Sequence, residues 1–198
     1  MKRYCLYLFI LIGISCSAEL KAQKNGTVYK GNDPAVRYTG RTLVSPDGSV
    51  AFDWVGTYLE TRFTGGKLSV KVSETGTSYY NVFVDGKLHK VVKVCGTDTL
   101  IHLVSGIDKR IHSLKIQKRS EGEFGKTTVH QFVLSGSGRL AEEPAVRTRH
   151  IEFIGNSLTC GYGTDGKHRD EPFLVETENC NLTFASMVCL LYTSPSPR

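Results

Sequence analysis

Between about residues 28 and 140, the sequence is a succession of short strand-like segments separated by turn residues. Residues 67–72 alternate apolar and polar side chains, the pattern of a strand with one buried face. Asp85-Gly86 follows another such segment and strongly indicates a two-residue hairpin turn. The predicted strand regions cover residues 49–64, 67–72, 80–84, 88–94, 99–104, 112–118 and 127–134. Because no long helical period interrupts them, the sequence predicts an all-β sandwich, jelly-roll-like, over residues 23–145.

The strand pattern ends near residues 141–149. Glu142-Glu143-Pro144 breaks it, and a proline biases the preceding residue away from helix. Residues 150–154 then form an apolar run, which predicts the first parallel strand of a second domain. We expect residues 148–188 to be the N-terminal part of an α/β domain, too short to bury a core alone.

The most distinctive chemistry lies in residues 151–163. The apolar run is followed by Gly155, Asn156 and Ser157, and then by two further glycines, Gly161 and Gly163. This order predicts a tight turn at the carboxyl end of a strand, where open α/β sheets place their reactive groups. A serine there has an exposed hydroxyl and a backbone N–H near a helix N-terminus, the two requirements of a nucleophile with an oxyanion site. The alternative is an ordinary turn in which the serine caps a helix.

This segment resembles the first block of the SGNH (GDSL-type) esterases. With Thr159-Cys160-Gly161-Tyr162-Gly163 included, it looks like carbohydrate esterase family 2. Residues of the strand-rich region are similar to the N-terminal β-sandwich of the same family: Gly40-Arg41, Trp54 with Gly56, and Tyr80 through Asp85-Gly86. The resemblance implies an N-terminal sandwich followed by the start of an α/β SGNH-hydrolase domain.

The resemblance also implies a function. Ser157 would be the nucleophile and, through its own N–H, an oxyanion donor in the removal of O-acetyl groups from plant cell-wall polysaccharides such as xylan. The family's other oxyanion donors and its catalytic histidine would lie beyond Val188, so the chain as written is expected to be inactive. The resemblance implies no metal and no cofactor. Asn156 departs from the aspartate of many members, which leaves the nucleophile in place.

Two other functions stay open. The first is a non-catalytic carbohydrate-binding protein, in which aromatic side chains of the sandwich stack on sugars, although such side chains are more often core. The aromatic candidates are Trp54, Tyr58, Tyr79 and Tyr80. The second is an SGNH esterase that acts on a lipid or on another acylated glycan. The intact serine segment favours an enzyme over a binding protein.

The N-terminus predicts a signal peptide over residues 1–22. Lys2 and Arg3 precede an apolar stretch at residues 6–14, and Ala18 and Ala22 are candidate cleavage positions. Cys16 suggests a lipoprotein, but its preceding residues fit that signal poorly. We expect export to the bacterial periplasm or the extracellular space, with no later segment long enough to span a membrane.

The C-terminus departs from the pattern before it. Residues 178–188 predict the beginning of a helix, whereas residues 189–198 end in Thr-Ser-Pro-Ser-Pro-Arg. This tail resembles the translation of a transposase-based sequencing adapter. We therefore expect it to lie outside the fold and the natural gene to continue. An authentic disordered tail is the alternative.

The charge of the chain does not indicate nucleic-acid binding. The formal net charge is +6, and about half of it lies in the predicted leader and tail. A group of basic residues alternates with apolar ones and is expected on a solvent-exposed strand face: Lys109, Arg110, Lys115, Lys118 and Arg119.

The cysteines between leader and tail are Cys95, Cys160 and Cys180, an odd number for an exported chain. A disulfide between Cys160 and Cys180 is a possible pairing. No Cys/His spacing in the sequence indicates a zinc site. The histidines of the sandwich and the loop residue His168 are expected to be structural or solvent-facing, not catalytic.

Overall fold

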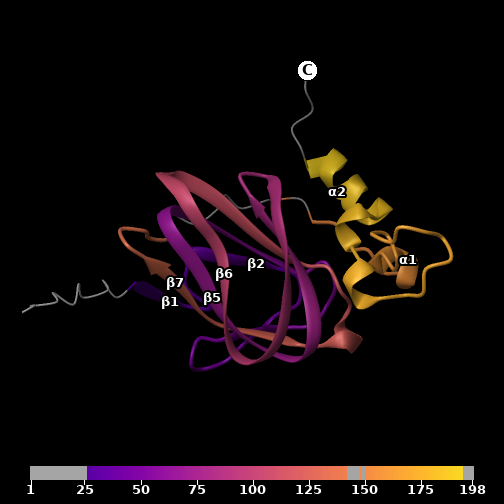
Figure 1. The fold of residues 1–198 in the computed structure, drawn as a ribbon, viewed down its shortest axis with the longest axis horizontal. Coiled ribbons are helices and arrows are strands. Elements are labelled where there is room, and N and C mark those ends of the chain that lie inside the picture. Colours follow the sequence, from indigo (N-terminus) through magenta and orange to yellow (C-terminus); the bar gives the residue numbers. More distant parts are fainter. Residues whose placement is uncertain (1–25, 142–147, 149, 194–198) are drawn as a thin grey trace, which may run out of the picture.

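The structure is a computed structural model and describes residues 26–141, 148 and 150–193. Its first part is built from strands and one short 3₁₀ helix, and its last part from short helices and loops (Figure 1). The elements are β1 (Thr27–Lys30), β2 (Val36–Thr39), β3 (Leu43–Val44), β4 (Val50–Phe52), β5 (Tyr58–Val84), β6 (Lys87–Lys118), η1 (Gly122–Phe124), β7 (Thr127–Ser135), α1 (Ser157–Cys160), η2 (Val175–Thr177), η3 (Cys180–Leu182) and α2 (Phe184–Thr193). The predicted signal peptide, most of the predicted domain junction and residues 194–198 lie outside the described residues.

The strands form a curled antiparallel sheet that closes on itself as a sandwich. The hydrogen-bonded order is β2-β5-β7-β4-β3, with β1 on β7 and β6 on β5. The long strands β5 and β6 bend and pass through both layers. Residues 66–74 of β5 lie between β6 and β7, so that Leu68 pairs with both Val104 and Leu134. Residues 80–84 of β5 lie between two stretches of β6, with Tyr80 opposite both Val92 and Lys118.

Every predicted strand region contains strand, but the boundaries differ from the prediction. The second half of the region predicted at residues 49–64 and the segments at 67–72 and 80–84 belong to one strand, β5. The segments at 88–94, 99–104 and 112–118 belong to another, β6. Glycine permits the bend at Gly66, whose φ is +90° and where an added Cβ would lie 2.5 Å from the carbonyl oxygen of Ser135. The glycine that predicted the end of a strand therefore marks a bend within one continuous strand.

The predicted hairpin turn is confirmed. Asp85 and Gly86 have φ values of 50° and 76°, and Val84 pairs with Lys87 across the turn. Positive φ at both central residues is the geometry that matches the twist of two antiparallel strands. Asp85 also accepts a hydrogen bond from the backbone N–H of Ser113 at 2.9 Å, which ties the turn to the far end of β6.

The core of the sandwich is apolar and comes from both layers. Its completely buried side chains include Phe63, Leu68, Val82, Phe132 and Leu134. Tyr80 contributes a buried ring whose hydroxyl hydrogen-bonds Thr127. Since these residues come from β5 and β7 and pack together, the predicted all-β sandwich is confirmed.

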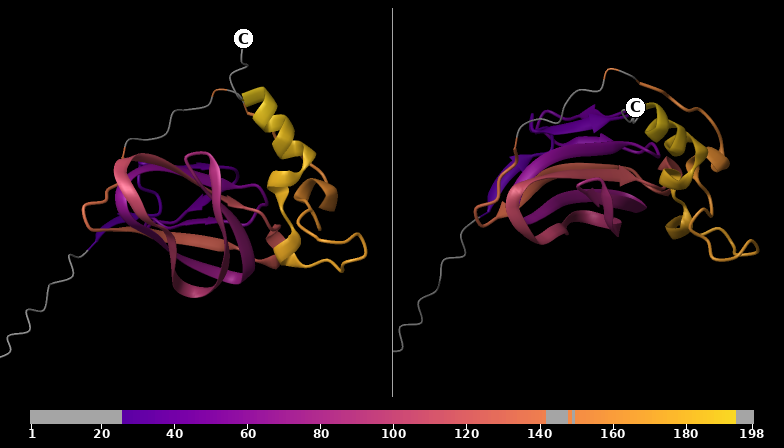
Figure 2. Two further views of the ribbon diagram at one scale, coloured as in Figure 1. Left: turned by 45° about the horizontal axis from the view of Figure 1, so that its top comes forward. Right: turned by 90° about the horizontal axis from the view of Figure 1, so that it is seen from above.

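The last part of the chain lies beside one end of the sandwich (Figures 1 and 2). The strand predicted at residues 150–154 is wrong, because these residues form no strand, and Ile154 is 90% exposed. A parallel strand needs neighbours for its backbone groups, and the described residues around this stretch offer helices and loops instead. Phe153 packs edge-to-face on Phe184 of α2, with ring centroids 6.2 Å apart.

The C-terminal helix also differs from the prediction. Residues 178–183 hold the 3₁₀ helix η3, and α2 begins only at Phe184. The helix then continues to Thr193, through the first residues of the predicted tail. Among the described residues, no helix is long and apolar enough to cross a membrane.

Candidate functional site

Ser157 is the first residue of the short helix α1 and is exposed to solvent. Asn156 caps this helix: its side-chain Oδ1 accepts a hydrogen bond from the backbone N–H of Leu158 at 3.2 Å. The carbonyl of Ser157 accepts hydrogen bonds from Gly161 and Tyr162 at 2.9 and 3.1 Å. The cap is thus Asn156 rather than Ser157, which leaves the serine hydroxyl available for another role.

Two glycines make this turn possible. An added Cβ at Gly155 would lie 2.0 Å from Oγ1 of Thr159. Gly161 ends the helix with a φ of +90°, and an added Cβ there would lie 2.6 Å from the carbonyl oxygen of Asn179. The glycines of the sequence motif therefore serve close packing and a left-handed helix end, which holds Ser157 at the outer end of the turn.

Within the described part of the chain, no histidine hydrogen-bonds Ser157. The buried His112 contacts Asp85 and Asp108 at 2.7 and 2.9 Å, on the sandwich. His168 is exposed in the loop after α1. The described chain thus presents an exposed serine on a tight turn, with no histidine hydrogen-bonded to it.

The loop after Ser157 is anchored on the sandwich by one buried arginine. Arg119 is 2% exposed, and its Nε donates to the carbonyl of Glu178 at 2.7 Å. Its Nη2 donates to the carboxylate of Asp165 and, at 3.0 Å, to the carbonyl of Glu176. The guanidinium therefore joins three separate points of the loop to the end of β6.

Buried amides extend this anchor. Asn81 on β5 donates from Nδ2 to Oδ1 of Asn179 at 2.9 Å, and its own Oδ1 accepts from Arg119 at 3.4 Å. Asn179 in turn donates to Asp165 at 3.1 Å. This Arg119 network, consisting of Arg119, Asn81, Asn179 and Asp165, satisfies polar groups that the sandwich and the loop bury together.

The prediction that Lys118 and Arg119 lie on a solvent-exposed face is wrong. Both are buried, and the ammonium of Lys118 donates to Ser78 and to the carbonyl of Gly125. Lys109 and Arg110 are exposed as predicted. Lys118 follows Leu114 and Ile116 at the inward-facing positions of β6, so the alternation of the strand itself places it inside the sandwich. Arg119 lies just after the strand and is covered by the docked loop.

An aromatic contact strengthens the same junction. Tyr162, five residues after Ser157, stacks on Phe173 with ring centroids 4.1 Å apart. Both rings lie against Phe124 of η1, at 6.4 and 5.6 Å. The hydroxyl of Tyr162 donates to Glu121 and contacts Glu123 at 3.1 Å. The turn that carries Ser157 is thereby fixed to the sandwich on its C-terminal side.

The predicted sugar-stacking aromatics do not share one environment. Tyr80 belongs to the core, whereas Trp54 is 57% exposed. The guanidinium of Arg41 lies 5.1 Å from the Trp54 ring centroid and pairs with Glu152 at 3.0 Å. Trp54 therefore lies close to the segment that leads to Ser157, on the face where the sandwich and the last part of the chain meet.

The possible disulfide between Cys160 and Cys180 is wrong, since both thiols are free and buried. Cys180 donates its S–H to the carbonyl of Lys118 at 3.4 Å. Burial raises the pKa of each thiol to about 12. Each thiol therefore stays protonated at neutral pH unless a cation binds it.

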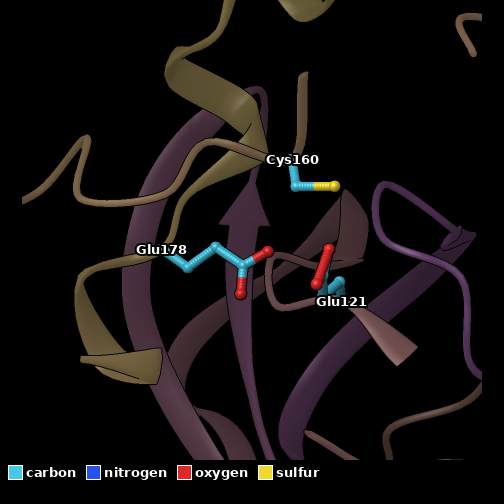
Figure 3. Close-up of side chains that lie close together, drawn as sticks. All are labelled: Glu121, Cys160 and Glu178. Atoms are coloured by element: carbon cyan, nitrogen blue, oxygen red, sulfur yellow. The ribbon is translucent and has the colours of Figure 1, made fainter. Parts of the chain in front are cut away.

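One cluster of possible metal ligands was missed by the sequence reasoning. Glu121, Cys160 and Glu178 bring ligand atoms within 4.8 Å of one another (Figure 3). Glu178 is completely buried, and burial raises the pKa of its carboxyl to about 8. The three residues are far apart in sequence and follow no known spacing, so only the docking of the loop on the sandwich brings them together.

Comparison with known proteins identifies the family. The family described as "Carbohydrate esterase 2 N-terminal" matches residues 38–144, more than half of the chain. The chain is 32% identical over 156 residues to the cellulase/esterase CelE of Acetivibrio thermocellus. The matched region covers 79% of this chain and 19% of the relative. It is 29% identical over 135 residues to an acetylxylan esterase / glucomannan deacetylase of Cellvibrio japonicus. This match covers 68% of this chain and 37% of the relative.

Solved structures agree with this result. A family 2 carbohydrate esterase from Clostridium thermocellum, in complex with cellohexaose, superposes with a TM-score of 0.74 at 32% identity and covers 78% of this chain. A family 2 esterase from Cellvibrio japonicus has the same fold, with a TM-score of 0.76 at 24% identity and 83% coverage. The chain spans less than half of each of these relatives. On the extent of the family match and the shared fold, the chain belongs to carbohydrate esterase family 2.

Proposed function

We propose that the chain is part of an exported serine esterase that removes O-acetyl groups from plant cell-wall polysaccharides such as xylan. The observation that carries this proposal is the exposed Ser157 on a glycine-bounded turn capped by Asn156. Relatives named as acetylxylan esterases and glucomannan deacetylases support the substrate class. The proposed division is a signal peptide over residues 1–22, a sandwich over 23–145 and the first part of the SGNH domain over 148–188.

In the proposed mechanism, Oγ of Ser157 attacks the carbonyl carbon of the acetyl ester while a base takes its proton. The negative charge moves to the carbonyl oxygen, which the backbone N–H of Ser157 and further donors stabilise. The base gives this proton to the polysaccharide oxygen, which leaves as a hydroxyl. Water, deprotonated by the same base, then attacks the acetyl-serine; acetate is released and the base returns a proton to Oγ of Ser157. No step requires a metal. The base is proposed to be a histidine outside this chain, because Ser157 has no histidine partner among the described residues.

The test compares three proteins in the release of acetate from acetylated xylan. They are the 198-residue chain, the protein read from the source gene past the codon for Val188, and its Ser157→Ala variant. We expect activity from the longer protein only, and a loss of at least about 10³-fold in kcat on removing the nucleophile. Equal activity of the longer protein and its Ser157→Ala variant would refute the role of Ser157.

A second candidate function is carbohydrate binding without catalysis. It is favoured by the exposed ring of Trp54 beside the Ser157 segment, because flat aromatic rings stack on sugar faces. Titration of the chain with cellohexaose and with xylohexaose, followed by tryptophan fluorescence, tests it directly, since Trp54 is the only tryptophan. Binding that is lost in Trp54→Ala, together with an inactive longer protein, would make this the better description.

A further inference from the structure

The strongest unassigned feature is the cluster of Glu121, Cys160 and Glu178 at the junction of the sandwich and the Ser157 segment. Glu121 lies just before η1 of the sandwich, Cys160 is the last residue of α1, and Glu178 lies between η2 and η3. Their ligand atoms all lie within 4.8 Å of one another. In Figure 3, the carboxylate of Glu178 extends toward Glu121, and the sulfur of Cys160 lies close to both carboxylates.

A second observation concerns Glu178 alone. The residue is completely buried, and neither carboxylate oxygen has a hydrogen-bond partner among the described residues. A buried carboxylate without a partner costs several kcal/mol when ionised, so native structures keep such groups neutral, pair them or place them on a metal. The two buried cations of this junction are already engaged: Lys118 donates to Ser78 and Gly125, and Arg119 donates to the loop carbonyls and Asp165.

We propose that Glu121, Cys160 and Glu178 bind a zinc-like divalent transition-metal ion that locks the Ser157 segment to the sandwich. One thiolate and two carboxylates are ligands that Zn²⁺ accepts, whereas Ca²⁺ and Mg²⁺ prefer oxygen donors alone. A tetrahedral ion at its usual ligand distances needs donor atoms about 3.5 Å apart, so the three side chains must close in on the ion from separations that lie within 4.8 Å. Three protein ligands leave one position for water.

Tyr162 supplies the outer support that such a site needs. Its hydroxyl donates to one carboxylate oxygen, Oε1, of Glu121. The other oxygen of Glu121 is thus left for the ion, and the hydrogen bond fixes the orientation of the carboxylate. Because Cys160 ends the helix that begins at Ser157, an ion bound to its sulfur anchors the serine-bearing turn to the sandwich.

The experiment titrates Co²⁺, as a spectroscopic substitute for Zn²⁺, into the chelator-treated chain. A thiolate bound to Co²⁺ gives a charge-transfer absorption in the near ultraviolet that carboxylates do not give. We expect one equivalent to produce this band and Zn²⁺ to displace it. Cys160→Ser should abolish the band, and Glu178→Gln should weaken Co²⁺ binding at least about tenfold. Cys95→Ser, which removes an exposed thiol on β6, should leave the band unchanged.

A melting experiment confirms that the variants are folded. In chelator, Glu178→Gln should melt no lower than the unmodified chain, because it removes a buried carboxylate that has no partner. Zn²⁺ should then raise the melting temperature of the unmodified chain but not of this variant. The proposal is overturned if Co²⁺ gives no thiolate band, if the band survives in Cys160→Ser, or if Zn²⁺ stabilises the Glu178→Gln variant equally.

Discussion

The sandwich and the segment that carries Ser157 are stabilised by different kinds of contact. The sandwich buries phenylalanine, leucine and valine side chains from both of its layers. In residues 150–189, Ile154 and Leu158 are 90% and 74% exposed, and the most deeply buried side chain is that of Glu178. The sandwich therefore has a core of its own, whereas the Ser157 segment depends on its contacts with the sandwich, which are mainly polar and include one aromatic contact on Phe124.

This difference determines how each region responds to change. Apolar burial contributes about 1.5–3 kcal/mol per large side chain and tolerates small shifts. The hydrogen bonds of a buried arginine depend on geometry, and their gain is offset by the cost of removing charges from water. The Arg119 network thus fixes the position of the Ser157 segment precisely and contributes less to overall stability than the sandwich core does.

The largest expected effect is in the sandwich core. Phe132→Ala removes a completely buried ring from β7 and should lower the free energy of unfolding by about 3–5 kcal/mol. Urea unfolding followed by far-ultraviolet circular dichroism measures this loss. A loss below about 1 kcal/mol would mean that the sandwich is not the stable unit of the chain.

The next largest effect should undock the loop while the sandwich stays folded. Arg119→Met keeps the apolar stem of the side chain but removes the hydrogen bonds that the guanidinium donates to the loop. This variant should weaken docking of the loop by about 3 kcal/mol. Limited proteolysis should then cut within residues 163–178 while the sandwich stays intact. If the loop resists protease as in the unmodified chain, the docking does not depend on Arg119.

A pH effect is expected within the sandwich. The hydrogen bond to Asp85 raises the pKa of His112 above 6.5, against the effect of burial. A raised pKa in the folded state contributes stability that is fully present below about pH 6.5 and is lost as the pH rises through the folded value. Urea unfolding between pH 5 and 9 should show this decline. His112→Gln should flatten the decline, whereas His89→Gln, at an exposed position, should preserve it.

The smallest expected effect is at the exposed pair of Arg110 and Asp108. Their side chains are joined at 2.8 Å but are more than half exposed, so solvent screens the pair. Arg110→Ala should leave the melting temperature unchanged within error. A clear fall would show that this exposed pair supports the nearby His112 cluster, through the contact of Asp108 with His112.

The sandwich was largely predictable because its signals are local. Strand alternation at residues 67–72 and the Asp85-Gly86 turn each depend on neighbours in sequence, and both are confirmed. The long bent strands were not predicted, because a glycine such as Gly66 has the same sequence signature in a bend as in a strand end.

The site was predictable only in part. The turn at Ser157 is encoded by Gly155 and Gly161 close by, and the structure has the predicted helix start there. The burial of Arg119 and the grouping of Glu121 with Glu178 arise from tertiary docking, and alternation along β6 gives no sign of them. The prediction of a strand at residues 150–154 was wrong for the same reason, since a strand needs partners that its own sequence does not specify.

Amide hydrogen exchange across the whole chain tests most directly whether the sandwich holds the Ser157 segment. The best probe is the N–H of Asn179, which donates to the carbonyl of Gly161 at 3.0 Å and is buried at the junction. We predict that this amide is protected, but opens with a lower free energy than amides of β7 such as Phe132. Protection equal to that of β7 would mean that both regions unfold as one unit, and no protection would mean that the segment is not docked; either result would contradict this account.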